Sequence, residues 1–413
     1  MKTIKLFAYL LCYAVYPFSF LFVRNKRRLA FGSSKNAFND NAKYLFIYCQ
    51  NERQDLDSAW LSLSRKTVAE VRAKGLKAYY TFSVRGMWHA LTSKYWFYNA
   101  YTSDIMFAFS GNAICVDLWH GVGLKRTEFN IHSGKLAERY QKTSFKEVFY
   151  HPEVFRRPNW VVTSTPFQTK MFAPAFRIPE DRCLEVGYPR NEILLWPEEK
   201  RLKHVERYEP FETKELLCKI KKGSYQRVFV YMPTWRDSQR EIFVQGFDLK
   251  KMEAILRSQN AMLLLKPHPN TIIDASAFGS FSNIELVEAN VDVYPMLPYV
   301  DVLITDYSSV LYDYVLMEGN DVILYLYDYE EYVKEREFFY PFDENVVGKK
   351  AFTFEELCRC IEQGDYKMDI AQRNRVVEKF WGKTVMCSAN QAITSRFFPT
   401  FANEQAFCHM EAK

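Results

Sequence analysis

The chain has 413 residues, of which 48% are hydrophobic and 25% charged, and its formal net charge is +6. This length provides for two domains of ordinary size, and the composition excludes a disordered or fibrous chain. The mild positive charge fits an anionic substrate or membrane surface but is too small to indicate nucleic acid, and no nucleic-acid motif is evident. The nine cysteines lack metal-binding or redox spacing, which indicates a reduced, cytosolic setting.

The first 28 residues combine an apolar stretch with a basic cluster. Residues 6–23 are almost wholly apolar, and as a helix they would span about 27 Å, the short edge of what crosses a bilayer. The cluster at 24–28 carries four positive charges and would keep the following chain cytoplasmic. No small-x-small cleavage site follows, which disfavours a signal peptide. We expect residues 1–28 to associate with the cytoplasmic face of the membrane, as a short anchor or as a helix lying in the interface, with a buried soluble helix as the alternative.

The part of the chain at 29–200 alternates between strand-like and helix-like segments. Helices are expected at 58–74, which Gly75 would end, at 88–100 and from Phe167 onward, whereas 39–50 could be either. Strands are expected at 29–33, 76–82, 104–110, 113–118, 160–164 and 183–186. This alternation predicts βαβ units and a parallel sheet, and therefore an α/β fold.

The strand expected at 113–118 runs directly into Trp119, His120 and Gly121. A histidine at the carboxyl end of a strand can face a ligand cleft, and an adjacent glycine allows close backbone approach. Lys125 and Arg126 add positive charge nearby, which favours a functional interpretation. The alternative is a structural turn in which His120 satisfies a backbone carbonyl.

A second alternating region follows a charged, turn-rich stretch, and we place an interdomain linker at 201–225. Domains are therefore expected at 29–200 and 226–395, followed by a tail at 396–413. Strands are expected at 227–232, 261–265, 300–304 and 321–327, and helices at 249–256, 310–317, 355–362 and 374–380.

Two of these strands end in residues that suit phosphate binding. The strand at 261–265 leads into Lys266-Pro267-His268-Pro269, and the strand at 300–304 leads into Thr305-Asp306-Tyr307-Ser308-Ser309. Ser308 or Ser309 could cap the following helix and donate its hydroxyl to a phosphate oxygen at the positive helix terminus. Each piece alone would be an ordinary turn or cap, but together they predict a diphosphate site.

Five motifs follow one another along the chain: Trp119-His120-Gly121 with Lys125, Gly187-Tyr188-Pro189-Arg190-Asn191, Met232-Pro233-Thr234-Trp235-Arg236, Lys266-Pro267-His268-Pro269, and Ile304-Thr305-Asp306-Tyr307-Ser308-Ser309 with Asp313. Together they resemble the CDP-glycerol glycerophosphotransferase family, which contains the TagB/TagF-like primases and polymerases of wall teichoic acid and relatives in capsule synthesis. The resemblance extends from about residue 29 to about residue 385.

The resemblance implies a GT-B-like fold, in which an acceptor-side and a donor-side Rossmann-like domain face each other across a cleft. It implies transfer of glycerol phosphate, or a related polyol phosphate, from CDP-glycerol or another CDP-polyol, with release of CMP. The implied acceptor is a hydroxyl of an undecaprenyl-type lipid-linked saccharide at the membrane. By position, His120 resembles the general base of the family and His268 its second essential histidine. Residues that fall where the family binds the CDP group are Arg236, Lys266, Thr305, Asp306, Ser308, Ser309 and Asp313, and Gly121, Lys125 and Thr234 would shape the cleft.

The sequence also departs from the family pattern. Asn320-Asp321 stands where Lys-Pro is common, Arg336-Glu337 where Arg-Gly is usual, and Gly123 where proline often follows Trp-His-Gly. The first two departures lie near the donor end and leave the polyol open. A metal is not clearly called for: Asp306 and Asp313 could bind Mg²⁺, but Asp306 could equally orient neighbouring backbone.

The sequence is also compatible with two alternative functions. A sugar-nucleotide-dependent GT-B glycosyltransferase of capsule or lipopolysaccharide synthesis would use the same fold but attack an anomeric carbon. A membrane-bound scaffold with a decayed site is the second alternative, and the intact histidines argue against it.

Overall fold

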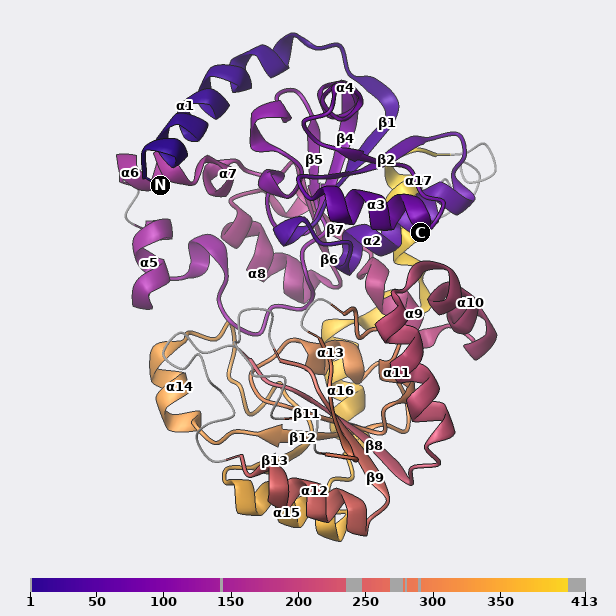
Figure 1. Ribbon diagram of the computed structural model, residues 1–413. Helices are drawn as coiled ribbons and strands as arrows, with labels where there is room; N and C mark the ends of the chain where they lie inside the picture. The colour runs from indigo at the N-terminus through magenta and orange to yellow at the C-terminus, as the bar shows by residue number, and fades with distance from the viewer. Residues whose placement is uncertain are drawn as a thin grey trace, which may run out of the picture. The chain divides into compact units, whose positions relative to one another are not determined.

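The computed structural model describes residues 2–141, 144–234, 247–267, 278, 281–288 and 291–399, and side chains are described for these except at 2–8, 135 and 335. The chain divides into two compact units (Figure 1). The first contains Met1–Gly121, Glu128–Glu192 and Trp381–Lys413, and the second contains Val122–Thr127 and Ile193–Phe380. Each unit is built on a parallel sheet, which confirms the predicted α/β fold.

The sheet of the first unit has the strand order β3-β2-β1-β4-β5-β6-β7, and each neighbouring pair is parallel. The strands are β1 (Asn25–Phe31), β2 (Asp57–Ser62), β3 (Ala78–Tyr80), β4 (Ser93–Tyr98), β5 (Ile114–Asp117), β6 (Trp160–Thr163) and β7 (Cys183–Glu185). The helices are α1 (Lys2–Phe18), α2 (Asp40–Glu52), α3 (Arg65–Ala73), α4 (Val84–Thr92), α5 (Gly134–Gln141), α6 (Phe145–Tyr150), α7 (Pro152–Phe155), α8 (Pro166–Phe176) and α17 (Ala389–Phe397), with 3₁₀ turns that include η1 (Ser19–Leu21) and η4 (Phe107–Phe109). The strand order reverses between β1 and β4, and ligands of open α/β sheets bind at the carboxyl ends beside such a reversal.

Two predicted helices of this unit are partly strands. The segment at 58–74 divides into β2 and α3, and the segment at 88–100 divides into α4 and β4. The reason is burial in the sheet, because Trp60 and Trp96 are fully buried on central strands, where large aromatic residues pack well. The strand predicted at 104–110 is absent from the described structure, which has 3₁₀ turns there instead.

The N-terminal helix α1 spans Lys2–Phe18, so it ends five residues before the end of the apolar stretch at 6–23. Among the described residues, no helix has both the length and the apolarity needed to cross a membrane. The basic cluster after α1 is also not uniformly exposed. Arg24 donates to the backbone carbonyls of Gly111, Ala90, Ser93 and Phe109 at 2.6–3.0 Å, and burial lowers its pKa to about 10. It therefore fastens the chain to the unit and is not a free surface cation.

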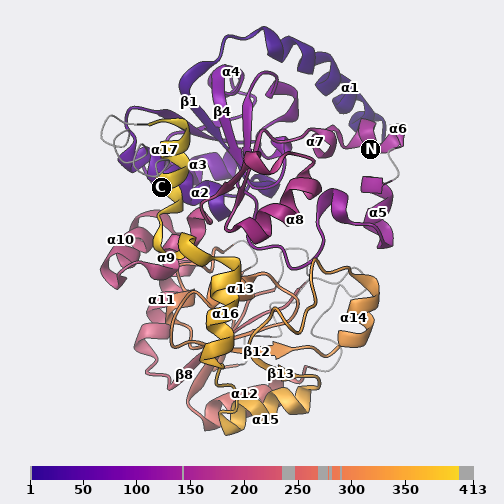
Figure 2. The ribbon, with the colours of Figure 1, turned by 180° about the vertical axis from the view of Figure 1, so that it is seen from behind.

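The sheet of the second unit has the order β10-β9-β8-β11-β12-β13, again with parallel neighbours. Its strands are β8 (Arg227–Met232), β9 (Ala261–Leu265), β10 (Ile284–Leu286), β11 (Val302–Thr305), β12 (Asp321–Tyr325) and β13 (Lys349–Ala351). Its helices are α10 (Glu198–Tyr208), α11 (Phe211–Lys222), α12 (Leu249–Ser258), α13 (Val310–Tyr314), α14 (Tyr329–Glu335), α15 (Phe354–Gln363) and α16 (Ile370–Phe380), with α9 (Glu192–Leu195) at the boundary. Here the order reverses between β8 and β11. Figure 2 shows α16 beside α13 on one side of this unit.

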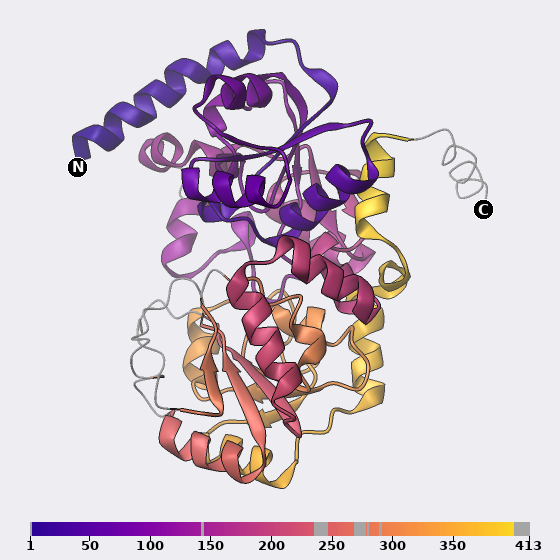
Figure 3. The ribbon, with the colours of Figure 1, turned by 45° about the vertical axis from the view of Figure 1, so that its right-hand side comes forward.

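The unit boundaries differ from those expected. Residues 201–225, expected to be a linker, form α10 and α11 within the second unit (Figure 3). Their periodicity explains this, because Leu216, Leu217 and Ile220 of α11 are buried along one helical face. The chain also enters the second unit briefly at Val122–Thr127 and returns to the first at Glu128. It enters the second unit again at Ile193 and returns to the first at Trp381.

Candidate functional site

In the first unit, His120 lies on a sharp turn three residues after the end of β5. The side chain of His120 is exposed, whereas Trp119 before it and Gly121 after it are buried. Trp119 has a φ of 51° and Gly121 a φ of 115°. A left-handed conformation is unfavourable for a bulky residue such as tryptophan and costs of the order of 1–3 kcal/mol, so the surrounding structure must hold it.

Two side chains hold the backbone of this turn. The carboxylate of Asp117 accepts a 2.8 Å hydrogen bond from the Trp119 N–H, and the Asn41 amide donates to the carbonyls of Leu118 and Trp119 at 3.3 and 2.8 Å. Asp117 is fully buried, and burial raises its pKa well above the usual range of a carboxyl group. The Trp119 indole packs against Phe176 of α8 with ring centroids 4.8 Å apart. Backbone and indole are thus both fixed, which compensates for the left-handed conformation.

The exposed imidazole of His120 is oriented on two sides. Its ring lies against the Trp119 indole with centroids 3.9 Å apart, and its Nδ1 faces the Asn99 carbonyl at 3.4 Å, at the long end of hydrogen bonding. When Nδ1 carries the proton toward Asn99, Nε2 is the basic nitrogen. In that tautomer, Nε2 is the ring nitrogen that can accept a proton from a reacting group.

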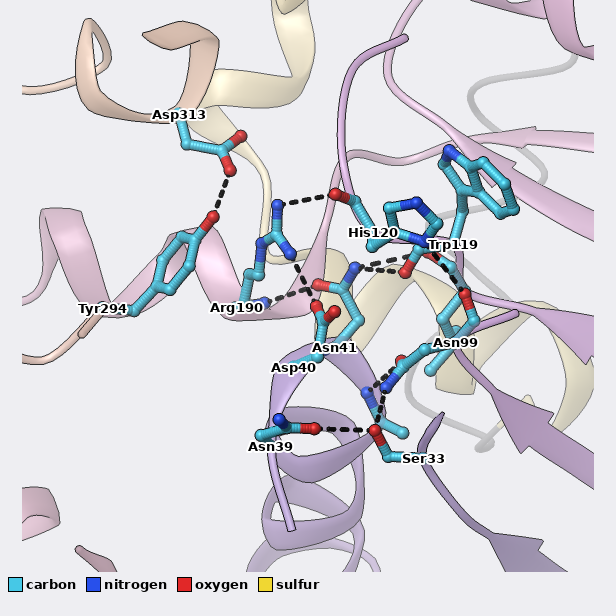
Figure 4. A network of polar contacts seen from close by, with 12 residues as sticks. Ser33, Asn39, Asp40, Asn41, Asn99, Trp119, His120, Arg190, Tyr294 and Asp313 are labelled. Carbon is cyan, nitrogen blue, oxygen red and sulfur yellow. Dashed lines mark hydrogen bonds and ion pairs between the residues drawn. The ribbon is translucent and has the colours of Figure 1, made fainter. Parts of the chain in front are cut away.

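A buried polar network supports this turn from behind (Figure 4). Arg190 donates from Nη2 to the His120 carbonyl at 2.8 Å, from Nη1 to Asp40 at 2.7 Å, and from its N–H to the Asn41 side chain at 3.1 Å. Asn99 accepts from the Ala42 N–H at 2.9 Å and donates to Ser33 at 2.8 Å. The network joins the loops after β1, β4, β5 and β7, so several parts of the first unit fix the position of His120.

The sequence alone assigns no role to Asn41 or Asn99. Arg190 lies in Gly187-Tyr188-Pro189-Arg190-Asn191, one of the motifs that carry the family resemblance, so a sequence signal marks it. Asn41 and Asn99 are single polar residues within apolar segments, and the sequence contains no pattern that marks them.

In the second unit, the turns after β8 and β11 are joined by Asp306 and Thr305. The Asp306 carboxylate accepts the Thr234 N–H at 2.9 and 3.1 Å, and the Thr305 hydroxyl donates to the Met232 carbonyl at 2.8 Å. Both side chains are buried. In this structure both side chains orient neighbouring backbone. For Asp306 this is the structural role, as opposed to binding of Mg²⁺.

Lys266 follows β9 at the same edge of the sheet. It is buried, its N–H donates to the Tyr231 carbonyl at 2.9 Å, and its ammonium donates to the Glu288 carbonyl. Burial lowers the pKa of Lys266 to about 8, and the carboxylates of Asp292 and Glu288 partly oppose this shift. A buried amine with a pKa near 8 changes its charge close to neutral pH.

The turn Tyr307-Ser308-Ser309, called the serine turn below, leads into a helix that is shorter than predicted. Ser308 and Ser309 are half-buried, and α13 spans only Val310–Tyr314, not residues 310–317. Ser309 occupies the N-cap position without a side-chain capping bond, and Ser308 accepts the Val310 N–H only at 3.4 Å. Asp313 is fully buried in α13 and accepts a hydrogen bond from the Tyr294 hydroxyl (Figure 4).

The serine turn rests on an aromatic stack. Tyr307 is fully buried, and its ring lies parallel to that of Tyr332 in α14, with centroids 3.8 Å apart and planes 7° apart. The Tyr307 hydroxyl donates to Asp328 at 3.2 Å, and the Lys125 ammonium lies 5.9 Å from the centre of the Tyr332 ring. Lys125 therefore belongs to the second unit together with the serine turn.

The segment Val122–Thr127 is anchored in the second unit by backbone pairing. Lys125 forms an antiparallel bridge with Phe338, the Arg126 N–H donates to the Glu337 carbonyl at 2.9 Å, and the Phe339 N–H donates to the Leu124 carbonyl at 3.1 Å. Two departures from the family pattern thus meet here, because Gly123 precedes one paired stretch and Glu337 lies on the other.

Two of the predicted site residues, Arg236 and His268, lie outside the described residues. Among the described residues, no group of three or more His, Cys, Asp or Glu side chains could hold a metal ion. The other predicted residues fall into two sets: His120 and Gly121 in the first unit, and Lys125, Thr234, Lys266, Thr305, Asp306, Ser308, Ser309 and Asp313 in the second.

Comparison with known proteins gives one family match. The profile of the CDP-Glycerol:Poly(glycerophosphate) glycerophosphotransferase family matches residues 14–387. The teichoic acid glycerol-phosphate transferase of Staphylococcus aureus strain NCTC 8325 / PS 47 is 26% identical over 73% of this chain and 74% of its own length. The teichoic acid poly(glycerol phosphate) polymerase of Bacillus spizizenii strain ATCC 23059 / NRRL B-14472 / W23 is also 26% identical, over 84% of this chain and 86% of its own length. The corresponding polymerase of Staphylococcus epidermidis strain ATCC 35984 is matched over only 42% of its length.

Solved structures share the fold. A structure of the wall teichoic acid polymerase TagF has a TM-score of 0.68 at 20% sequence identity, covering 91% of this chain and 90% of that one. A second TagF structure, from a soak with CDPG, has a TM-score of 0.71 at 21% identity, covering 91% of this chain and 89% of that one.

Proposed function

Because this chain belongs to the CDP-Glycerol:Poly(glycerophosphate) glycerophosphotransferase family, we propose that it transfers glycerol phosphate, or a related polyol phosphate, from a CDP-linked donor to a hydroxyl group, releasing CMP. The acceptor is a lipid-linked saccharide of the undecaprenyl type, and the product is a teichoic-acid-like or capsule polymer. The observation that carries the proposal is the exposed His120 imidazole on a turn that buried groups hold in a left-handed conformation.

His120 acts as the general base in this proposal. The acceptor hydroxyl attacks the β-phosphorus of the donor, and its proton passes to Nε2 of His120. The bond between the β-phosphorus and the bridging oxygen breaks, and CMP leaves with that oxygen. A neutral imidazole in this role contributes roughly 10²–10⁴-fold to the rate.

In this proposal the second unit binds the donor. The Lys266 ammonium and the Ser308 and Ser309 hydroxyls follow β9 and β11, on both sides of the strand reversal. Cations and hydroxyl donors at such a place stabilise the charge of transferring and leaving phosphates, and this supplies most of the catalysis in phosphoryl transfer. Arg236 and His268 join this set through the family resemblance.

The enzyme works at the cytoplasmic face of the membrane, where a lipid-linked acceptor is located. The apolar N-terminal segment provides the attachment, lying on the bilayer surface.

The decisive experiment incubates the full-length protein with a lipid-linked acceptor analogue and a panel of donors: CDP-glycerol, CDP-ribitol and several sugar nucleotides. Mass analysis should show an acceptor that is heavier by one or more polyol phosphate units, together with CMP. Release of a nucleoside diphosphate from a sugar nucleotide, with a glycosylated acceptor, would instead establish the glycosyltransferase alternative.

A further inference from the structure

The outward side of α1 is unusual because it is apolar wherever its side chains are described, from Leu10 to Phe18. Leu10, Leu11, Ala14, Pro17 and Phe18 are exposed and recur at the spacing of one helical face. The inward side is apolar as well, since Cys12 and Val15 pack against a core cluster that contains Ala90, Ile105 and Phe109. A surface helix of a soluble protein normally exposes charged and polar groups on its outer side.

The apolar surface continues beyond α1. Leu21 and Val23, in the stretch after the helix, are 77% and 89% exposed. We call Leu10, Leu11, Ala14, Pro17, Phe18, Phe20, Leu21 and Val23 the α1 face. Figures 1 and 3 show α1 along the outside of the first unit.

Helix α4, which packs on the same core cluster as α1, adds a second exposed apolar element of the first unit. Its inward residues Met87 and Leu91 pack on the same core cluster as α1, whereas Val84 and Trp88 are 80% and 58% exposed. The two elements are tied together because Arg24, which follows the α1 face, donates to the carbonyls of Ala90 and Ser93. Exposed apolar patches of this extent mark surfaces that bind a partner.

The charges around these elements indicate the partner. The sequence contains no Asp or Glu from residue 1 to 39 or from 71 to 103. Lys26 and Arg27, just after the α1 face, and Arg85 of α4 are exposed, and Arg27 is also ion-paired with Asp55 at 3.4 Å. An apolar face bordered by cations, with a tryptophan at its side, matches the interface of an anionic bilayer.

We infer that the α1 face and the exposed side of α4 together form one docking surface that lies flat on an anionic lipid bilayer, with Val84 and Trp88 entering the interface beside α1. This inference deepens the membrane part of the proposed function by naming α4 as a second contact that the sequence did not indicate. Attachment through two elements fixes the orientation of the first unit on the bilayer, which one helix alone would not do.

The test is flotation of the full-length protein with vesicles of phosphatidylcholine, with or without phosphatidylglycerol. The parent should bind the anionic vesicles. The variants Leu11→Ser/Phe18→Ser/Leu21→Ser and Val84→Ser/Trp88→Ser should each lower the partition coefficient roughly tenfold or more, because each loses apolar area that the bilayer would bury. A matched control, Phe211→Ser/Ile370→Ser, removes equally exposed apolar side chains from the second unit and should bind like the parent.

Three outcomes would overturn the inference. Unchanged binding of the α4 variant would exclude α4 from the surface, and unchanged binding of the α1 variant would exclude the α1 face. A parent that fails to bind vesicles but forms a dimer, which the α1 variant dissolves, would show that a second copy of this chain covers the surface. Since all the substituted residues are exposed, the variants should unfold at the same temperature as the parent. Transfer to a short-chain, water-soluble acceptor should also be unchanged, so loss of vesicle binding is separable from failure of the proposed chemistry.

Discussion

The rings of Tyr307 and Tyr332 stack with their centroids 3.8 Å apart, which places α14 directly behind the serine turn of the second unit. Tyr307 is part of the motif that carries Ser308 and Ser309, whereas Tyr332 belongs to no motif. The serine turn is thus held by a residue that lies outside the sequence signature.

Replacing Tyr332 by leucine should raise the KM for the CDP-linked donor roughly five- to tenfold, with a smaller change in kcat. The reason is that a stacked aromatic pair contributes about 0.5–1.5 kcal/mol beyond its burial, and without it the serine turn loses its support. Tyr332→Phe keeps the ring and should restore the parent KM. Equal effects of the two variants, or a change confined to thermal stability, would contradict a positioning role.

Replacing His120 by alanine should lower kcat by roughly 10²–10⁴-fold, because the general base is removed. Binding of the donor, measured by calorimetry, should be nearly unchanged, since the donor groups lie on the second unit. His132→Ala is a suitable control, because His132 is an exposed histidine of the same unit. Full activity of the His120→Ala protein would refute the base assignment.

Asn41 is a buried amide whose loss should affect both stability and rate. It donates to the carbonyls of Leu118 and Trp119 and accepts the Arg190 N–H, so Asn41→Ala leaves several buried polar groups without a partner. Each such group costs about 1–3 kcal/mol. We expect a lower midpoint in urea unfolding, together with a fall in kcat at temperatures where the variant is fully folded. A stability loss with an unchanged kcat would show that the His120 turn does not depend on Asn41.

Because of Lys266, we expect the free energy of unfolding and the affinity for the donor to change in opposite directions as the pH rises. Its pKa in the folded protein is about 8, below its ordinary value of 10.5, so the folded state holds fewer protons than the unfolded state between these values. The burial cost of the charged amine is therefore present below pH 8 and is relieved as the pH rises toward 10.5. Relative to Lys266→Met, the parent should gain unfolding free energy across this range, by about 3 kcal/mol at most.

Donor affinity should change in the other direction. The charged form of Lys266 attracts the donor phosphates, so the KM for the donor should rise as the pH passes 8. Lys266→Arg stays charged at these pH values and should show a flatter profile. A parent profile without any inflection between pH 7 and 9 would argue against a phosphate contact by this amine.

The sequence was most informative where long patterns repeat. Alternation predicted the parallel α/β fold, and strands such as β8 and β9 were placed at their observed bounds, Arg227–Met232 and Ala261–Leu265. It was least informative where a strand and a helix follow each other without a turn signal, as at 58–74 and 88–100, because aromatic residues serve both as helix faces and as sheet core. Ordered motifs supplied the two sets of predicted site residues, which remain predictions. The stack on Tyr332 and the Asn41 network were not predictable from motifs, because they depend on contacts between distant segments.

The brief passage of Val122–Thr127 through the second unit has a practical consequence for anyone who divides this protein. No single cut in the gene separates one folded half from the other. A fragment that begins at residue 193 would omit the short edge formed by Leu124, Lys125 and Arg126, and the backbone around Phe338 would lose its neighbour. A donor-binding half suitable for isolated work would therefore need these residues grafted back.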